Sequence, residues 1–123
     1  MYRGSKGGVL FKLNTAGQYT VLYTFTSGTD GVWPLVGVVL DPAGNLYGTT
    51  QYGGYSSACY GSGCGVVYKL DTAGQYTVLY SFSGENDGGD YASGLIPDPA
   101  GNLYGTTTYG GTHDGGMVFK IKQ

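Results

Sequence analysis

The residues best suited to chemistry in this 123-residue chain lie in four variable segments rich in glycine, aromatic rings and carboxylates, at 26–33, 51–65, 83–93 and 108–116. Aromatic rings offer flat apolar faces on which sugars stack, and carboxylates accept hydrogen bonds from sugar hydroxyls. This mixture favours carbohydrate binding. The candidate ligand-binding residues are Asp30, Trp33, Tyr52, Tyr55, Asp87, Asp90, Tyr91 and Tyr109, and the same segments hold Tyr60, Glu85, His113 and Asp114.

A structural interpretation of these residues stands beside the carbohydrate hypothesis. Tyr and Trp side chains bury large apolar areas, so the rings could instead pack between neighbouring structural units. The pairs Asp30-Gly31 and Asp87-Gly88 occupy equivalent places in a sequence repeat described below, which favours a role in turns.

A calcium site at Glu85, Asp87 and Asp90 is a further hypothesis, because Ca²⁺ takes several oxygen ligands. The spacing of these carboxylates does not match the EF-hand loop, so a solvated acidic loop is the favoured interpretation. We expect no other cofactor.

Motifs that carry known catalytic mechanisms are absent from the sequence. His113 is the only histidine, it stands beside Asp114, and neither GxSxG nor HExxH occurs. Paired carboxylates hydrolyse glycosides, but no pattern places two of them at the required separation. We therefore predict a protein without enzymatic activity, with a glycoside hydrolase as the alternative.

The two cysteines, Cys59 and Cys64, are five positions apart in the Gly/Ser-rich segment CYGSGC. This spacing favours a disulfide, which would place the chain in an oxidising compartment. Two free thiols are the alternative. Zinc is disfavoured because two sulfurs need two further ligands.

The composition excludes several classes of protein. Charged residues make up 11%, where about a quarter is typical, and the chain has 25 Gly and 13 Tyr. Coiled coils need more Glu, Lys, Ala and Leu, while 41% hydrophobic residues argue against disorder. A net charge of −2 argues against nucleic-acid binding. No stretch approaches the roughly 18 apolar residues of a membrane helix. The first six residues carry charge with no apolar stretch behind them, so no signal peptide is visible in the sequence.

A repeat with an offset of 57 residues dominates the sequence. Between 8–54 and 65–111, 30 of 47 aligned pairs are identical. The predicted organisation is one repeat domain over 1–123, with repeats at about 8–64 and 65–115 and the start of a third at 116–123.

Each repeat contains four stretches with the two-residue alternation of β-strands. They are PLVGVVLD (34–41), NLYGTT (45–50), GVVYKL (65–70) and QYTVLYSF (75–82). The linking segments DPAGN and DTAGQ are typical of tight turns. Because 34–41 is the most continuously apolar stretch, it is predicted to be buried on both faces. No window shows the 3.6-residue period of a helix, so the chain is predicted to be all-β.

Four antiparallel strands that repeat every 50 to 60 residues or so are typical of a β-propeller blade. The segment VVLDPAGNLYGTT resembles the inner hairpin of NHL-type and regulator-type propellers. More specifically, GNLYGTT and TVLY[TS]F, each present twice, resemble the GloVer-type tandem repeat of secreted, surface-anchored bacterial proteins. The resemblance implies an extracellular protein built from β-propeller-like four-stranded blades, and it implies no activity.

The phase of the repeat predicts incomplete blades. Along the chain, the first and the last predicted strands both correspond to the third strand of a repeat. Two repeats are also fewer than the four or so blades of a closed propeller. We expect copies of the chain to share strands, with 18–25 completing a neighbour's last blade in a ring or filament. A fragment of a longer propeller is the other explanation.

The favoured function is therefore a non-enzymatic extracellular structural or assembly protein whose partners are copies of itself. A lectin-like propeller module that binds glycans through its variable loops is the alternative, and no nucleic acid or membrane insertion is expected. The short turns and the variable segments should lie at opposite ends of the strands. The segment GMVFKI at 116–121 should be a strand, with Met117, Phe119 and Ile121 on one face.

Overall fold

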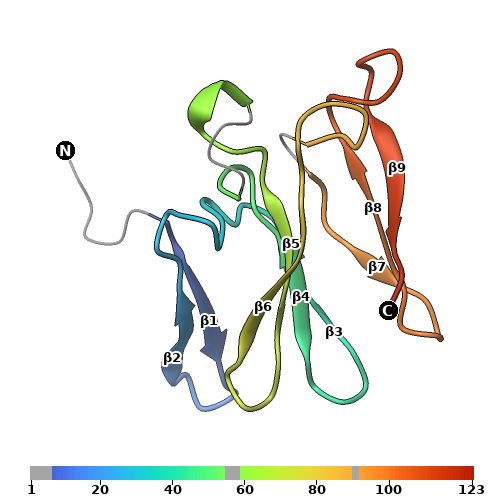
Figure 1. Cartoon of the computed structure of the whole chain (residues 1–123). Helices are drawn as coiled ribbons and strands as arrows, with labels where there is room; N and C mark the ends of the chain where they lie inside the picture. The colour runs from blue at the N-terminus through green and yellow to red at the C-terminus, as the bar shows by residue number, and fades with distance from the viewer. Residues whose placement is uncertain (1–6, 55–58, 90–91) are drawn as a thin grey trace.

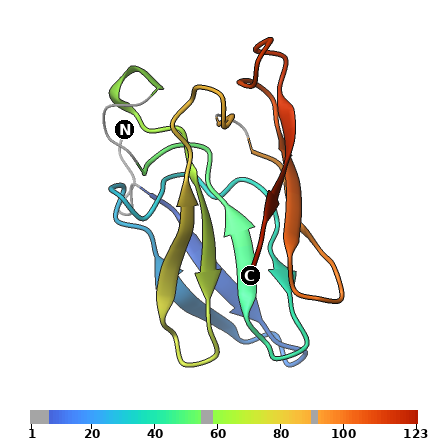
Figure 2. The ribbon, with the colours of Figure 1, turned by 45° about the vertical axis from the view of Figure 1, so that its right-hand side comes forward.

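The computed structural model describes residues 7–54, 59–89 and 92–123. The prediction of an all-β chain is confirmed. The described residues form three antiparallel sheets, and their only helical segment is the short 3₁₀ turn η1 (Cys59–Gly61). The three sheets follow one another in chain order across Figure 1, and Figure 2 shows the first sheet behind the middle one.

The sheets contain two, four and three strands in chain order. The first sheet pairs β1 (Val9–Leu13) with β2 (Tyr19–Thr24). The middle sheet has the order β3 (Val39–Leu40), β4 (Leu46–Thr49), β5 (Val66–Leu70) and β6 (Tyr76–Ser81). The last sheet has the order β7 (Ile96–Pro97), β8 (Leu103–Thr107) and β9 (Met117–Ile121). The middle sheet has the four antiparallel strands of a blade-like unit, as the repeat predicts.

The middle sheet is covered on both faces by the neighbouring sheets, and its strands direct alternate side chains to the two sides. On one face, Val66, Tyr68 and Leu70 of β5 pack against Leu10 and Phe25 of the first sheet. On the other face lies a second core, shared with the last sheet, formed by Tyr47, Cys64, Val67, Phe82, Ala92, Leu95 and Leu103.

The turns of the repeat are closed by their own polar side chains. The Asp41 carboxylate accepts hydrogen bonds from the backbone and side-chain amides of Asn45 and from the hydroxyl of Tyr47. These bonds from Asn45 and Tyr47 stabilise the charged carboxylate and lower the pKa of Asp41 to about 2. Asp98 closes the equivalent turn in the same way. The DxxGNxY pattern is thus a local device that joins two strands.

The first strand of the repeat is shorter and more exposed than predicted. Strand β3 contains two residues, and the second of them, Leu40, is 62% exposed. Ile96, the first residue of the equivalent strand β7, is 70% exposed. The prediction that 34–41 is buried on both faces is wrong. The reason is that β3 lies at the edge of the middle sheet, where Leu40 borders an open hollow between the first and middle sheets instead of packing against side chains.

Two other predictions about the strands are confirmed. Residues 117–121 form β9, paired with β8, and Phe119 and Ile121 pack against the second core while Val118 is exposed. The four short turns between paired strands lie at one end of the sheets and the long variable segments lie at the other (Figure 1).

Candidate functional site

Tyrosine and phenylalanine rings join the first and middle sheets along what we call the first seam. The rings of Tyr23 and Tyr76 stack in parallel, with centroids 4.1 Å apart and planes 7° from parallel. Phe25 lies edge-on against Tyr68 and Tyr76, with centroid distances of 5.4 and 5.7 Å. These contacts between sheets bury the rings and add the specific geometry of aromatic pairs.

Asp30 is the polar centre of the first seam. Its carboxylate accepts hydrogen bonds from the Tyr23 hydroxyl and from the backbone and side chain of Thr26, and its backbone carbonyl accepts from the Tyr76 hydroxyl. Burial raises the pKa of Asp30, but these hydrogen bonds to the carboxylate outweigh burial, and the net pKa is lowered. Conversely, burial and the bond to Asp30 raise the pKa of Tyr23 to about 12.

A second seam joins the middle and last sheets with nearly the same ring geometry. Phe82 and Phe119 lie edge-on with centroids 5.3 Å apart and planes at 70°. Their equivalents in the first seam, Phe25 and Tyr68, lie 5.4 Å apart at 69°. The spacing of the sheets is therefore repeated, as expected for successive blades.

The polar centre is repeated too. The Tyr80 hydroxyl donates to Asp87 at 2.7 Å, and the backbone amide and hydroxyl of Ser83 donate to the same carboxylate. Burial raises the pKa of Asp87, but these bonds from Ser83 and Tyr80 dominate and lower it.

The second seam differs from the first in one respect. No strand of the described chain pairs with the outer edge of β9 in the way that β6 pairs with β5. A hollow of about 220 Å³ lies there, lined by residues of β6, of the loop that follows β6, and of β9. The Tyr80 side chain beside it is 38% exposed. We call Tyr80, Asp87 and the outer edge of β9 the receiving site.

The outer face of the first sheet is apolar and exposed. Phe11, Leu13, Tyr19 and Val21 are 47–62% exposed. Their repeat equivalents on the middle sheet, Tyr68, Leu70, Tyr76 and Val78, lie in the core between the first and middle sheets. We call the four exposed residues the outer face.

The variable loops carry a smaller aromatic group. Trp33 has a backbone φ of 60°, is 49% exposed, and lies edge-on to Tyr52 with ring centroids 5.6 Å apart. A positive φ is uncommon for a large side chain. The equivalent of Tyr52 is Tyr109, which is 51% exposed on the other repeat.

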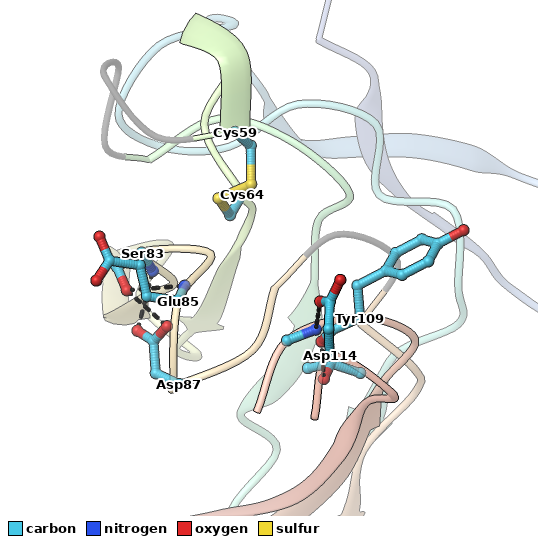
Figure 3. Close-up of a disulfide and its surroundings, with 9 residues drawn as sticks. Cys59, Cys64, Ser83, Glu85, Asp87, Tyr109 and Asp114 are labelled. Carbon is cyan, nitrogen blue, oxygen red and sulfur yellow. Dashed lines mark hydrogen bonds between the residues drawn. A yellow bond between two sulfur atoms is a disulfide. The ribbon is translucent and has the colours of Figure 1, made fainter. Parts of the chain in front are cut away.

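The predicted disulfide between Cys59 and Cys64 is present and packs against the loop that contains Asp87 (Figure 3). A Cβ atom added at Gly84 would lie 2.6 Å from Cys64 Sγ and 2.8 Å from Cys59 Sγ. Gly84 also has a φ of 82°. The disulfide therefore supports the loop that positions Asp87.

The structure separates the predicted ligand-binding residues into groups. Asp30 and Asp87 close the two seams, as the turn interpretation suggested, and Trp33 lies beside Tyr52. Tyr109 lies at the loop end of the last sheet. Tyr55, Asp90 and Tyr91 lie outside the described residues.

No metal-ligand cluster is assembled in the part of the chain that the structure describes. No three of its His, Cys, Asp and Glu side chains gather at one point. Of the proposed calcium ligands, Asp87 already accepts hydrogen bonds from Tyr80 and Ser83, and Asp90 lies outside the described residues. His113 is exposed and contacts the hydroxyl of Thr112.

Sequence reasoning predicted that 18–25 completes a neighbour's last blade, but it did not identify the side chains of the receiving site and the outer face. The signal was available in the repeat, since Tyr19 and Tyr80 belong to the duplicated segment QYTVLY. It could not be used without the spatial order of the sheets, which shows which equivalent residues are covered.

Comparison with protein families gives a match that spans almost the whole chain. The family model of the Gloeobacter/Verrucomicrobia repeat matches residues 2–123. A search of curated proteins finds none that matches. Among the described residues no helix is long and apolar enough to cross a membrane. Because the match covers nearly the whole chain and agrees with the duplicated strands and turns, this protein belongs to the Gloeobacter/Verrucomicrobia repeat family.

Proposed function

We propose that this chain is a non-enzymatic, extracellular building block whose copies associate by completing one another's incomplete blades, in a ring or a filament. The observation that carries the proposal is the outer face of the first sheet. In the middle sheet the equivalent face is buried against a preceding sheet of the same repeat.

The outer face suits a partner with the same repeat. An exposed row of large apolar side chains on a sheet is an aggregation hazard unless another surface covers it. The only surface seen to cover this type of face among the described residues is another sheet of the repeat, with its Tyr and Phe rings. A second copy of the chain carries such sheets.

The disulfide supports an extracellular setting, because disulfides persist in oxidising compartments. Low charge and many glycines are compatible with close packing of sheets, and tyrosine contributes large contact areas.

The test is the oligomeric state of the intact chain, measured by sedimentation velocity over a wide range of concentrations. The wild-type chain should form species larger than a monomer. Val21→Glu should shift the distribution to monomer, because the charge would be buried in the contact, while the 47% exposure of Val21 spares the folded monomer.

The matched control is Thr20→Glu on the same sheet. The equivalent residue Thr77 stays exposed even though its sheet is covered on both faces, so the charge should be tolerated. A wild-type chain that remains monomeric at every concentration would refute the proposed function.

A second candidate function is carbohydrate binding at the loop end. The specific observation is Trp33, whose exposed ring lies edge-on to Tyr52 on a backbone with positive φ. Strained backbone conformations cluster at ligand sites. A glycan array compares the wild-type chain with Trp33→Ala: binding that the substitution removes supports this function, and silence across all sugars excludes it.

A further inference from the structure

We propose that the receiving site binds strand β2 of a second copy of the chain, with Tyr19 of that copy stacked on Tyr80. The inference rests on the proposed self-association and identifies the contact that produces it.

The first seam shows the contact within one chain. Tyr76 on β6 stacks on Tyr23, and its hydroxyl donates to the backbone carbonyl of Asp30. Tyr80 and Asp87 are the repeat equivalents of Tyr23 and Asp30 and form the same hydroxyl–carboxylate bond, at 2.7 Å against 2.8 Å. The receiving site therefore presents the surface that binds a tyrosine in the first seam.

Tyr19 is the tyrosine that matches this surface. It is the repeat equivalent of Tyr76, and 58% of it is exposed. Its ring stacks on Phe11 with centroids 5.2 Å apart at 29°, much as Tyr68 and Tyr76 lie 5.4 Å apart at 24°. The Tyr19 ring thus already has the orientation that the Tyr76 ring adopts in the first seam.

The backbone can form the same ladder. Strands β1, β5 and β9 carry the same segment of the repeat, and β6 pairs with β5 in a register that places Lys69 opposite Thr77. The equivalent register of β9 with β2 of a second copy places Lys120 opposite Thr20. In this arrangement β2 leaves β1 of its own chain and pairs with β9 of the other copy. The five residue pairs between β1 and β2 are replaced by five between β9 and β2, as in domain swapping.

Each chain then has one strand to give and one site to receive it. Such a contact is heterologous, so successive copies join head to tail and either close into a ring or extend as a filament. The Tyr19 hydroxyl would donate to the backbone carbonyl of Asp87, as Tyr76 does to Asp30 in the first seam.

A cross-linking experiment tests the register. A Lys120→Cys chain is mixed with a Thr20→Cys chain, with the Cys59–Cys64 disulfide intact, and oxidised mildly. Facing strand residues lie about 4.5–5.5 Å apart at Cα, within reach of a disulfide. We expect a covalent dimer of twice the chain mass on non-reducing electrophoresis, and its loss on reduction.

The matched control replaces Thr20→Cys with Thr24→Cys. Residue 24 would lie opposite Met117, three positions from Lys120, or about 10 Å along the strand. This separation is too large for a disulfide, so the control mixture should give little dimer. Both threonines are exposed, so neither substitution threatens the fold.

Substitution of Tyr19 tests the ring itself. Tyr19→Phe removes one hydrogen bond and should weaken association about five-fold. Tyr19→Ser removes the ring as well and should leave a monomer. The exposure of Tyr19 spares the monomer in both variants.

The outcomes separate this inference from the proposed function. If the wild-type chain assembles but the Lys120→Cys and Thr20→Cys chains do not cross-link, or Tyr19→Ser assembles normally, strand exchange is wrong and self-association still stands. If the wild-type chain does not assemble, both proposals are wrong. Selective cross-linking together with a monomeric Tyr19→Ser variant supports the inference.

Discussion

Tyr68 lies directly opposite Gly48 in the ladder between β4 and β5, and its phenol ring covers the place where a side chain at Gly48 would begin. A Cβ atom at Gly48 would lie 2.7 Å from Cζ of Tyr68. The same arrangement recurs in the last sheet, where Phe119 lies opposite Gly105. The glycine of each GNLYGTT segment thus makes room for an aromatic ring on the next strand.

The Tyr68 hydroxyl provides the first prediction. It is buried and has no hydrogen-bond partner among the described residues, and burial raises the pKa of Tyr68. Because an unsatisfied buried hydroxyl is costly, Tyr68→Phe should raise the free energy of unfolding by about 1 kcal/mol. Urea denaturation measures the change. Equivalent positions 11 and 119 already hold Phe, and a marked loss of stability would show that the hydroxyl has a partner.

The second prediction compares the two seams. Tyr23→Phe removes a hydrogen bond to the buried carboxylate of Asp30 and should lower the free energy of unfolding by about 2 kcal/mol. Tyr80→Phe removes the equivalent bond to Asp87 where the ring is more exposed, so water can replace the lost donor and the cost should be smaller. Equal losses in urea denaturation would contradict this difference in burial.

The third prediction concerns acid stability. Hydrogen bonds to the carboxylates of Asp30, Asp41, Asp87 and Asp98 lower their pKa values in the folded chain. The unfolded chain therefore takes up protons first as the pH falls. Stability should be fully present above about pH 5 and should decline from about pH 4 towards pH 2.

Urea midpoints measured across this pH range test the prediction. Asp41→Asn removes one of the groups with a lowered pKa, so the variant should start from a lower stability and lose less of it in acid. Stability that is unchanged between pH 5 and pH 2 would contradict the lowered pKa values.

The fourth prediction concerns the loop beneath the disulfide. Gly84→Ala should lower the free energy of unfolding by about 1–2 kcal/mol, because the added Cβ would meet both sulfurs on a backbone with positive φ. Gly115→Ala is the control, since nothing lies within 4 Å of its added Cβ.

Removing the disulfide should relieve part of this penalty. The Cys59→Ser, Cys64→Ser chain itself loses about 2 kcal/mol of unfolding free energy by the loop-entropy relation. In that chain the further cost of Gly84→Ala should fall to the part that comes from the positive φ of the backbone. An undiminished cost in thermal denaturation would show that the sulfurs do not limit the space at Gly84.

The local features of this chain could be predicted from its sequence. Alternating apolar residues marked the strands that became β4, β5, β6, β8 and β9, and the DPAGN and DTAGQ segments marked their turns. These features depend on neighbours in the chain, as does the Cys59–Cys64 pairing. The prediction that 34–41 is buried on both faces was wrong, because its burial depends on the place of β3 at the edge of the sheet.

The environment of equivalent residues was decided only by the tertiary structure. Tyr19 and Tyr76 have the same sequence around them, yet Tyr19 is exposed while Tyr76 stacks on Tyr23, 53 positions away (76 − 23). The repeat alone determines that each tyrosine lies on a strand and on which face. Whether a ring is covered depends on which sheet packs against that face, and that contact comes from a distant part of the chain.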